Sequence, residues 1–432
     1  MPIPVIPGDL VPHQSEQEHW LKAEVARLCQ LEHHRFPGSQ PVSFSQRDLE
    51  KLEKQDFWVC EKSDGIRVLC LISTDLRSEA QNIYLIDRHN EYRQLSGLFF
   101  PHHENPRKPL RNSIIDGELV IDVDPRTKTE SMRYLAFDCL VVDDQNVMSR
   151  PLDKRYGRLK EWLHKPYDKM IRDHPHMANA QPFEIKVKEM SLSYHVEDVF
   201  SLIPNLKHGN DGLVYTCVTT PYTPATDPNI IKWKPPSENS IDFKLILRFP
   251  PLVTHPDQPD FHAKPVFVLH AWNGERGRSA VYDLYDELHV TDEEWEKMKV
   301  TGEQYDDRIV EVHWDPNQSC WRLMRFRDDK PNGNHRSTVE KIIQSIAEGV
   351  EKEVLRSRSN AIRNAWKARH GQPQPPSAHP PPSRGPPNHQ GPPPLPPTVG
   401  RPVPAAEFRY GPLQQSQWSK VSGPATIAGM KR

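Results

Sequence analysis

The residues best suited to chemistry lie in one short stretch, Cys60-Glu61-Lys62-Ser63-Asp64-Gly65-Ile66-Arg67. It places a lysine between a glutamate and an Asp-Gly pair, with an arginine five positions on. An ordinary lysine is protonated at neutral pH, so it becomes a nucleophile only where cations or desolvation lower its pKa and an oriented target is held beside it. Taken alone, the pattern is more typical of a solvated lysine beside a hairpin turn. The rest of the chain has to decide between the two interpretations.

Two further segments place acids and an aromatic ring on expected strands. In residues 114–120, Asp116 and Glu118 are two positions apart, so their side chains lie on one face of a strand. Such a pair could bind a metal ion or orient a ribose hydroxyl, and it also suits a solvated strand face. In residues 134–140, Phe137 could stack on a base or fill the core.

Another two segments offer charges for a nucleotide. Asp211, at an Asp-Gly step before a strand-like run, could hold a magnesium ion or simply form a turn. Residues 230–235 read Ile-Ile-Lys-Trp-Lys-Pro, which as a strand sends Lys232 and Lys234 to the same face. Two ammonium groups converge favourably around an anion such as an α-phosphate, and they would depress the pKa of a nearby lysine. An exposed edge strand accounts for the pattern equally well.

The last chemical segment is a charged run at 321–334. Arg325, Arg327 and Lys330 are suited to the β- and γ-phosphates of a nucleoside triphosphate. Asp329 could coordinate a metal or hold a pyrophosphate leaving group. An exposed charged hairpin is the alternative interpretation.

The elements that must position these residues form two β-rich blocks. Residues 16–31 predict an amphipathic helix, and strand-like runs with interspersed helical patterns then follow to about residue 235. Five strand-like runs in 241–327 have the size of a small Greek-key barrel such as an OB-fold. Residues 337–369 predict one long helix with an apolar stripe. We therefore expect an α+β protein of antiparallel sheets with flanking helices plus an OB-fold β-barrel, divided at 1–240, 241–335, 336–370 and 371–432.

The last part differs in composition from the rest. Residues 371–432 hold 17 of the 44 prolines, so we expect a disordered, Pro-rich tail. Phe408, Tyr410 and Trp418 are isolated aromatics near its end and suggest a docking segment. With six basic residues and one acidic residue the tail carries +5, which leaves −7 on residues 1–370 of a chain whose net charge is −2. Such a body does not coat nucleic acid, so contact with one end of a strand is expected.

The cysteines and the hydropathy pattern indicate a compartment. Six cysteines are scattered without Cys-x-x-Cys spacing, which favours reduced thiols and gives no support for a zinc site. The sequence has no apolar run long enough for a membrane span, and it does not begin with a signal-peptide pattern. A nuclear or cytosolic protein is expected, without a membrane partner.

Taken in order, these segments resemble the six motifs of the covalent nucleotidyltransferase superfamily, which comprises the mRNA capping guanylyltransferases and the ATP-dependent DNA and RNA ligases. The matching residues are Lys62-Ser63-Asp64-Gly65, Asp116-Gly117-Glu118, Tyr134 to Leu140, Asp211-Gly212-Leu213, Lys232-Trp233-Lys234-Pro235 and Arg327-x-Asp329-Lys330-x-x-x-Asn334. The last two are similar to capping enzymes in particular, of the fungal type. The resemblance implies a nucleotidyltransferase domain over 1–240.

The resemblance also implies a two-step reaction with Mg²⁺ (or Mn²⁺) as cofactor. Lys62 attacks the α-phosphate of GTP, pyrophosphate leaves, and GMP passes from the lysine to the 5′-diphosphate end of nascent mRNA. Asp211 assists the metal. The implied nucleotide contacts are Arg67 and Glu118 to the ribose, Phe137 and Lys188 (or Lys186) to guanine, Arg88 to ribose or phosphate, Lys232 and Lys234 to the α-phosphate, Arg327, Asp329 and Lys330 around the leaving phosphates, and Glu61 beside the nucleophile.

The expected partners follow from the same resemblance. The sequence contains no phosphatase loop of the form His-Cys-x-x-Gly-x-x-Arg, so a separate RNA 5′-triphosphatase is expected, together with the phosphorylated tail of RNA polymerase II and a nuclear location. Because Lys62 and Arg327 lie in different domains, the barrel is expected to close over GTP for the first step and to open for the second. The alternatives are an ATP-dependent polynucleotide ligase and a non-catalytic scaffold that binds the polymerase tail.

Overall fold

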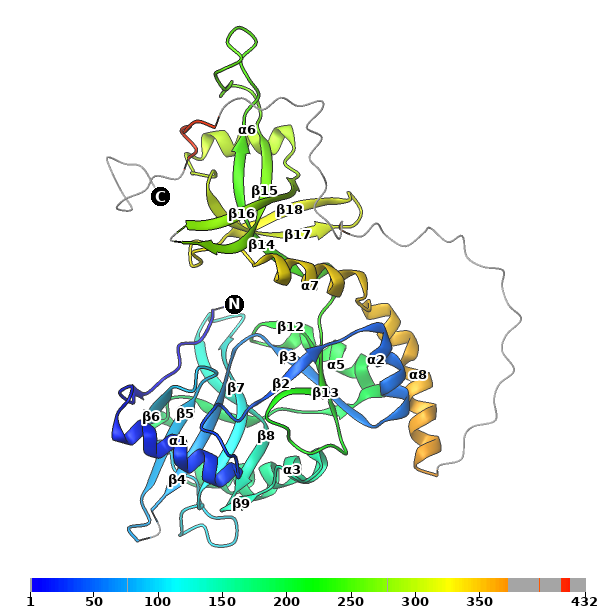
Figure 1. The fold of residues 1–432 in the computed structure, drawn as a ribbon. Coiled ribbons are helices and arrows are strands. Elements are labelled where there is room, and N and C mark those ends of the chain that lie inside the picture. The colour runs from blue at the N-terminus through cyan, green and yellow to red at the C-terminus, as the bar shows by residue number, and fades with distance from the viewer. Residues whose placement is uncertain (1, 76, 278, 372–395, 397–412, 420–432) are drawn as a thin grey trace, which may run out of the picture. The chain divides into compact units, whose positions relative to one another are not determined.

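The computed structural model describes residues 2–75, 77–277, 279–371, 396 and 413–419 (Figure 1). It divides into two compact units, of which the first comprises Met1–Lys234 with Glu351–Ser377 and the second Pro235–Val350 with Ala378–Arg432. No helix within the described ranges is long and apolar enough to cross a membrane. The disorder expected for 371–432 concerns residues that lie almost entirely outside the described ranges.

The first unit is built on two mainly antiparallel sheets, as predicted (Figure 1). The larger sheet has eight strands: β1 (Asp9–Leu10), β6 (Tyr92–Leu95), β5 (Gln81–Ile86), β4 (Ile66–Thr74), β7 (Ser113–Val123), β8 (Glu130–Val142) and β10 (Glu184–Val187) in spatial order, with β9 (Gln145–Asn146) paired to β8. The smaller sheet has five: β11 (Ser191–Leu192), β3 (Phe57–Ser63), β12 (Asn210–Cys217), β13 (Ala225–Trp233) and β2 (Ser39–Ser43). The pairs β8–β10 and β2–β13 are parallel.

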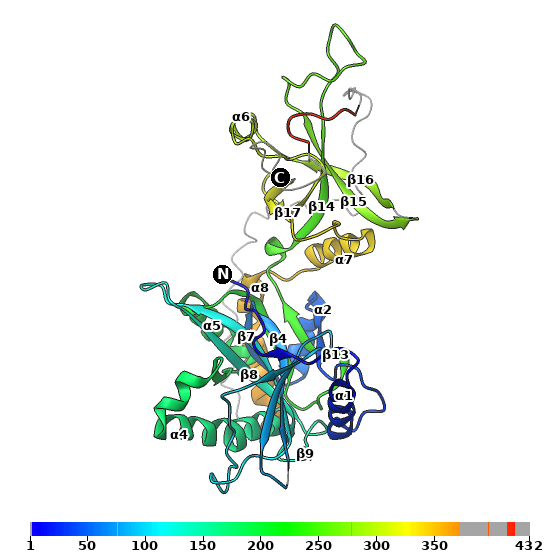
Figure 2. The ribbon, with the colours of Figure 1, turned by 90° about the vertical axis from the view of Figure 1, so that its left-hand side faces the viewer.

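The larger sheet is covered by helices on both faces. Along β4 the side chains alternate, so that Cys70 and Ile72 join the cluster that contains Tyr156 of α3 (Leu152–Arg158), whereas Leu69 joins the cluster that contains Leu21 of α1 (Glu16–Cys29). Figure 2 shows α1 and α4 (Lys165–Asp173) on opposite sides of this sheet. Burial on both faces explains why the middle of β4, residues 68–72, is apolar without interruption.

The second unit is a five-stranded barrel in the order β14 (Ser240–Arg248), β15 (Val266–Arg276), β16 (Ser279–Leu288), β18 (Cys320–Phe326) and β17 (Arg308–Asp315). The prediction of a small β-barrel here is confirmed. The barrel closes back on β14 through β17, while at its β16–β18 seam the strands share one bridge pair, Leu288 with Trp321. Helix α6 (Asp292–Val300) lies between β16 and β17 in the chain.

The single helix predicted over 337–369 is wrong, because the structure has two helices, α7 (Arg336–Ala347) and α8 (Lys352–Arg369). The break lies at Gly349, whose backbone is so close to Pro236 that a Cβ there would overlap the proline ring. Glycine within a helix also costs about 1 kcal/mol relative to alanine. The apolar stripe therefore serves both units: Val339 is buried in the barrel core, and Leu355 is buried in the first unit.

Helix α8 belongs to the first unit and packs beside α2 (Gln46–Lys54) and α5 (Val196–Leu202). Arg356 donates two hydrogen bonds to Glu197 at 2.6 and 2.8 Å, and Arg369 pairs with Asp56 at 2.7 Å. Ion pairs of exposed side chains contribute little each, so the burial of Leu355 and Ile362 is the main reason for this packing.

Candidate active site

A pocket lies between the two sheets of the first unit, walled by β4, β7 and β8 on one side and by β3, β12 and β13 on the other. It gathers residues that are far apart in the sequence, because each strand sends alternate side chains to the face that borders the pocket. Six of the residues predicted from the sequence line it: Lys62, Arg67, Arg88, Glu118, Phe137 and Lys188.

Lys62 is held by the segment just before and within the start of β12. Its Nζ donates to Asp211 Oδ1 at 2.5 Å, and Asn210 Nδ2 donates to the backbone oxygens of Lys62 and Gly212, both at 2.9 Å. Gly212 has φ +139°, and a Cβ there would overlap the Trp233 carbonyl. Only glycine therefore allows the turn that brings Asp211 to the lysine.

Further positive charge, on Lys232 and Lys234, lies close to Lys62 and Arg88, although neither Lys232 nor Lys234 is among the residues that line the pocket. Lys232, on β13, is in register with Val214 of β12, which in turn pairs with Cys60, two residues from Lys62. Partial burial, together with the positive charges of Lys62 and Arg88, lowers the pKa of Lys232. Lys234 directly follows β13 and adds to this effect. Such a group of cations is favourable only around an anion.

Arg67 forms a fixed part of the wall. It donates to both oxygens of Asp116, Nε to Oδ1 at 2.9 Å and Nη2 to Oδ2 at 2.5 Å, and Tyr222 Oη donates to the same carboxylate at 2.5 Å. Burial acts to lower the pKa of Arg67, but the Asp116 carboxylate outweighs it and raises the pKa. Asp116, considered above as a metal or ribose ligand, is thus occupied by Arg67.

Glu118 and Phe137 face the pocket from the opposite wall to Lys62. Burial raises the pKa of Glu118 to about 6, although the positive charges of Lys188 and Lys62 act against it. Between β7 and β8 the register shifts so that Asp116 pairs with Asp138 and Gly117 with Ala136, which leaves Phe137 unpaired as a β-bulge. A bulge redirects a side chain, and here the half-buried ring lies 5.7 Å from the Arg67 guanidinium.

Buried charged side chains form a network around Glu61 and Ser63, the two neighbours of Lys62 in the chain. Lys188 Nζ lies 2.9 Å from Glu61 Oε1 and donates to Ser63 Oγ at 2.6 Å. His208 lies between Glu61, at 3.5 Å, and Asp122, at 2.8 Å. Burial alone would raise the pKa of Glu61, but Lys188 and His208 bring it down to about 2. Glu61, expected beside the nucleotide, is therefore placed behind the pocket lining, paired with Lys188.

The other predicted residues lie elsewhere. Lys186, the alternative to Lys188, pairs with Glu184 at 2.8 Å and is not among the residues that line the pocket. Arg327, Asp329 and Lys330 belong to the barrel unit. Arg327 donates to Asp329 at 2.9 and 2.8 Å and to the buried Asp242 at 3.3 Å, and Lys330 also donates to Asp242.

Several residues that shape the pocket were not recognised from the sequence. Asp116 was noted, but its pairing with Arg67 was not. Asn210 directly precedes Asp211-Gly212 and His208 lies three residues before Asp211, so their closeness to that motif is a signal that could have identified them. Tyr222 lies in the connection between β12 and β13, and nothing in its sequence context points to a buried site.

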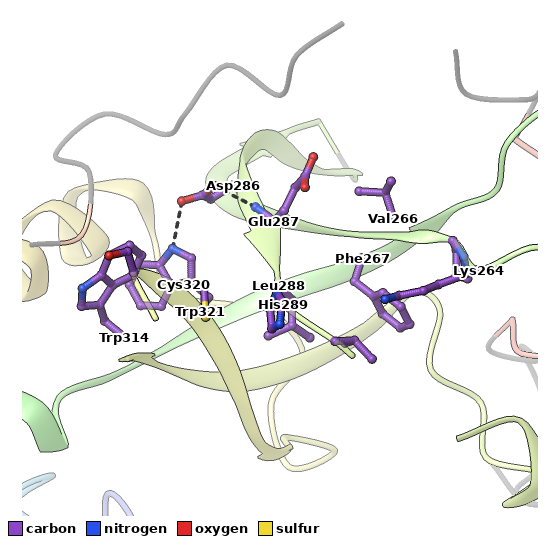
Figure 3. A pocket seen from close by; sticks show the side chains of 13 residues that line it. Lys264, Val266, Phe267, Asp286, Glu287, Leu288, His289, Trp314, Cys320 and Trp321 are labelled. Carbon is purple, nitrogen blue, oxygen red and sulfur yellow. Dashed lines mark hydrogen bonds between the residues drawn. The ribbon is translucent and has the colours of Figure 1, made fainter. Parts of the chain in front are cut away.

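The barrel has a pocket of its own, of about 480 Å³ against about 120 Å³ for the pocket between the sheets. Figure 3 shows that Phe267, Leu288 and Trp321 line it, with Asp286 accepting a hydrogen bond from Trp321 Nε1 at 3.0 Å. Size alone would favour this pocket over the one between the sheets. Its lining contains none of the predicted site residues and presents two carboxylates, so its chemistry is poorly suited to a triphosphate.

A candidate metal site occurs away from the pocket, among the described residues. Within the described ranges, one group of three potential ligands occurs, His102, His103 and Asp143. Arg111 already donates to both oxygens of Asp143, at 3.0 and 2.9 Å, so this carboxylate is engaged. Asp211 stands beside Lys62 as a single carboxylate, which is how Mg²⁺ is commonly held when phosphate oxygens and water complete its shell.

Comparison with known proteins agrees with this geometry. Residues 4–236 match the family model of the mRNA capping enzyme catalytic domain, and residues 238–356 match that of the mRNA capping enzyme C-terminal domain. The chain is 41% identical to the mRNA-capping enzyme subunit alpha of Neurospora crassa (81% of this chain, 90% of the relative) and 39% identical to that of Yarrowia lipolytica (86% and 94%). The protein of that name from Saccharomyces cerevisiae is 36% identical (85% and 87%).

Solved structures match far less well. A mycobacterial DNA ligase D complexed with ATP and MES is 13% identical, with a TM-score of 0.34, over 68% of this chain and 95% of that chain. A similarity at that level supports no conclusion. The family models and the relatives span both units and agree with one another, and on their evidence the chain belongs to the mRNA capping enzyme family.

Proposed function

We propose that this chain is the guanylyltransferase of mRNA capping, which carries GMP from GTP to the 5′-diphosphate end of nascent mRNA on Lys62. One observation supports this above all. The Lys62 amine reaches a pocket between two sheets whose walls present a carboxylate, an aromatic ring and several cations, in the form of Glu118, Phe137, Arg88 and Lys188. A lysine in such surroundings is suited to attack a bound phosphate.

In the first step, Lys62 gives up a proton and its nitrogen lone pair attacks the α-phosphorus of GTP. The bond from the α-phosphorus to the bridging oxygen breaks, and pyrophosphate leaves with that electron pair. We assign Lys232 and Lys234, together with Arg88, to offset the charge that builds up on the α-phosphate, and their closeness to Lys62 supports this role. We assign Arg327 and Lys330 of the barrel unit to the leaving phosphates.

The walls of the pocket account for recognition of the nucleoside. We propose that the Phe137 ring stacks on guanine and that Glu118 accepts a hydrogen bond from the ribose. Lys188 is the guanine contact. Because it is bonded to Glu61 and Ser63 in this structure, it must share or exchange one of these bonds when the base binds. The held guanidinium of Arg67 completes the ribose side of the pocket.

A divalent cation, Mg²⁺ or Mn²⁺, is the proposed cofactor. Bound, it would withdraw charge from the triphosphate oxygens and so favour attack. Asp211 fits the role of its protein ligand, because its carboxylate stands beside Lys62 and is about one-third exposed. Asp211 would then have two partners, Lys62 and the metal ion. Its carboxylate would orient the lysine amine toward the phosphate.

In the second step, a terminal phosphate oxygen of the RNA 5′-diphosphate attacks the phosphorus of lysyl-GMP. The P–N bond breaks, the lysine regains a proton, and a triphosphate bridge joins guanosine to RNA. The substrate must come from an RNA 5′-triphosphatase. The curated relatives are named subunit alpha, and we propose that a second subunit supplies that activity here. Recruitment by the phosphorylated RNA polymerase II tail and a nuclear location complete the proposal.

The test uses the full chain with magnesium and GTP or ATP labelled at the α-phosphate. We expect a labelled protein adduct from GTP that is acid-labile and alkali-stable, and no adduct from ATP. Lys62→Arg and Lys62→Ala should abolish it, whereas Lys186→Ala is the matched control and should retain it. Label from ATP instead of GTP would favour the ligase alternative. An adduct that persists in Lys62→Ala would refute the nucleophile.

A further inference from the structure

A short segment of the Pro-rich tail is docked on the barrel. Residues 413–419, which we name the tail segment, lie beside α6 and are drawn in red in Figure 1. The Trp418 side chain is 3% exposed and belongs to the hydrophobic core of the barrel. Its ring stacks on Phe249 with centroids 5.6 Å apart and lies 4.9 Å from the ring of Trp295 in α6. A residue far beyond the last helix thus completes the core of a domain.

The backbone of the tail segment is also held. Asp306 N donates to the Trp418 carbonyl at 2.9 Å, which forms a parallel bridge between Asp306 and Ser419. Ser419 Oγ donates to Asp306 Oδ2 at 3.0 Å and accepts from Ser416 N at 2.9 Å. The buried Trp418 ring and the hydrogen bonds to Asp306 fix the tail segment in one register. The same combination of apolar burial and directed hydrogen bonds is found where a peptide adds a strand to a sheet.

The surface that receives the segment, which we name the socket, comprises Phe249, Trp295 and Asp306. The Asp306 carboxylate is held in place by the barrel itself, because its Oδ1 accepts a hydrogen bond from Leu247 N at 2.8 Å. Its Oδ2 accepts the hydrogen bond from Ser419. Burial raises the pKa of Asp306, and the hydrogen bonds from Leu247 and Ser419 act against it. The socket therefore offers an aromatic slot next to an acceptor and suits a tryptophan followed by a hydroxyl residue.

We propose that the socket is a peptide-binding site and that its resident occupant is the chain's own tail segment, bound reversibly in cis. The covalent link raises the effective concentration of the segment at the socket, so a modest affinity suffices to keep the socket filled. Negative charge introduced at Ser419 would face Asp306 and expel the segment. The site is distinct from the pocket of Lys62, and its occupant belongs to the same unit of the protein.

The experiment uses the full chain, its Trp418→Ala variant and a fluorescein-labelled peptide of residues 411–421. The variant empties the socket without removing any of its residues, so we expect it to bind the peptide saturably. The wild-type chain should bind at least tenfold more weakly, because its own tail competes. A peptide with alanine in place of the tryptophan should bind neither protein. The lysyl-GMP adduct and circular dichroism report that both proteins are folded.

A second variant guards against misfolding of the first. Ser419→Asp keeps the tryptophan and should increase peptide binding at least threefold over wild type, whereas Ser422→Asp, outside the segment, should not. Equal peptide binding by wild type and Trp418→Ala would overturn the proposal, as would no binding to a folded Trp418→Ala. Docking into a second copy would instead appear as a concentration-dependent dimer in sedimentation that Trp418→Ala abolishes, and it would overturn the cis arrangement.

Discussion

Charge pairing determines which side chains of the pocket are free to respond to a nucleotide. Arg67 and Asp116 are both buried and joined by two hydrogen bonds, so moving either would leave a buried charge without its partner. Lys62 is different, because its side chain is 28% exposed and donates a hydrogen bond to the similarly exposed Asp211. The wall is therefore rigid and the nucleophile is adjustable, which is the arrangement that attack on a bound phosphate requires.

Glu118 should be destabilising when ionised. Its pKa is raised from 4.5 to about 6, which corresponds to about 2 kcal/mol of folding free energy. A pKa raised on folding gives a contribution that is present below pH 4.5 and lost as pH rises through 6. We therefore expect Glu118→Gln to be more stable than wild type by about 2 kcal/mol at pH 8 and equal to it at pH 4, measured by urea unfolding without nucleotide.

The same substitution should reduce adduct formation from GTP, since the ribose loses its carboxylate. The exposed Glu32→Gln serves as the control and should show no pH-dependent difference in stability. A Glu118→Gln protein that is less stable than wild type at pH 8 would contradict the burial of this charge.

His208 should show the opposite dependence on pH. Burial acts to lower its pKa, but hydrogen bonds to Glu61 and Asp122 outweigh this and raise it above 6.5. Its stabilising contribution is then complete below pH 6.5 and is lost as pH rises through the higher pKa of the folded state. We expect His208→Gln to lose about 2 kcal/mol at pH 6, with the loss shrinking toward pH 9.

Two readouts separate this role from a purely structural one. The pH-dependent stability difference should appear in chemical unfolding, and the rate of adduct formation should fall because Glu61, the neighbour of Lys62 on β3, loses one of its charged partners. His262→Gln, at an exposed position in the barrel unit, should change neither. A loss of stability that is constant from pH 6 to 9 would show that folding does not raise the pKa of His208.

The charged residues of the pocket could be predicted from the sequence, but their pairing could not. Lys62, Glu118 and Lys188 stand in segments whose order and spacing indicate a nucleotide site. Which carboxylate serves which cation depends on strand register. Arg67 and Asp116 are 49 residues apart, and Arg67 and Tyr222 are 155 apart. Such contacts follow from the fold as a whole, and no local pattern encodes them.

At the scale of elements, irregularities in the strands do most to shape the pocket. The bulge between β7 and β8 turns Phe137 into it, and a second register shift in β13 lies between Asp227 and Ile231, around Pro228. Proline lacks the N–H of a regular ladder and is tolerated at such a bulge. This is why β13 begins at Ala225, earlier than the strand expected from residue 230 onward.

Regular elements were the easier ones to predict. Helix α5, at Val196–Leu202, is one of the helical patterns expected between the strands before residue 235, because a short apolar face with flanking polar residues is a local signal. The break between α7 and α8 was missed since the close approach of Pro236 to Gly349 is a tertiary contact. A glycine inside a helical pattern does not reveal whether a neighbour will press against it.

Two glycines should respond to alanine with opposite signs. Gly212 has positive φ and no room for a Cβ, so Gly212→Ala should destabilise the protein by about 3 kcal/mol and abolish the adduct by displacing Asp211. Gly157 lies in α3 with open space around it, so Gly157→Ala should stabilise by about 0.5–1 kcal/mol and leave activity unchanged. Urea unfolding and adduct formation measure both. If Gly212→Ala changes neither the stability nor the adduct, the turn can shift enough to accommodate a Cβ.

At the scale of the whole molecule, the chain passes between its two units more than once. It enters the barrel unit at Pro235, returns at Glu351 to form α8, and contributes the tail segment to the barrel again. Each unit keeps its own hydrophobic core: that of the first includes Cys70 and Leu163, and that of the second includes Trp321 and Trp418. Separate cores allow separate unfolding, whatever the connections between them.

The two cores should therefore melt as two transitions that respond to different substitutions. At pH 8, Glu118→Gln should raise the transition of the first unit alone, for the reason given above. Trp418→Ala removes a buried indole from the barrel at a cost of about 3 kcal/mol and should lower the barrel transition by roughly 10 °C. Because the sites share no partner, the double variant should show both shifts unchanged in calorimetry. A single transition that follows either substitution would mean that the units unfold as one, and that the tail segment stabilises the nucleotide pocket as well as the barrel.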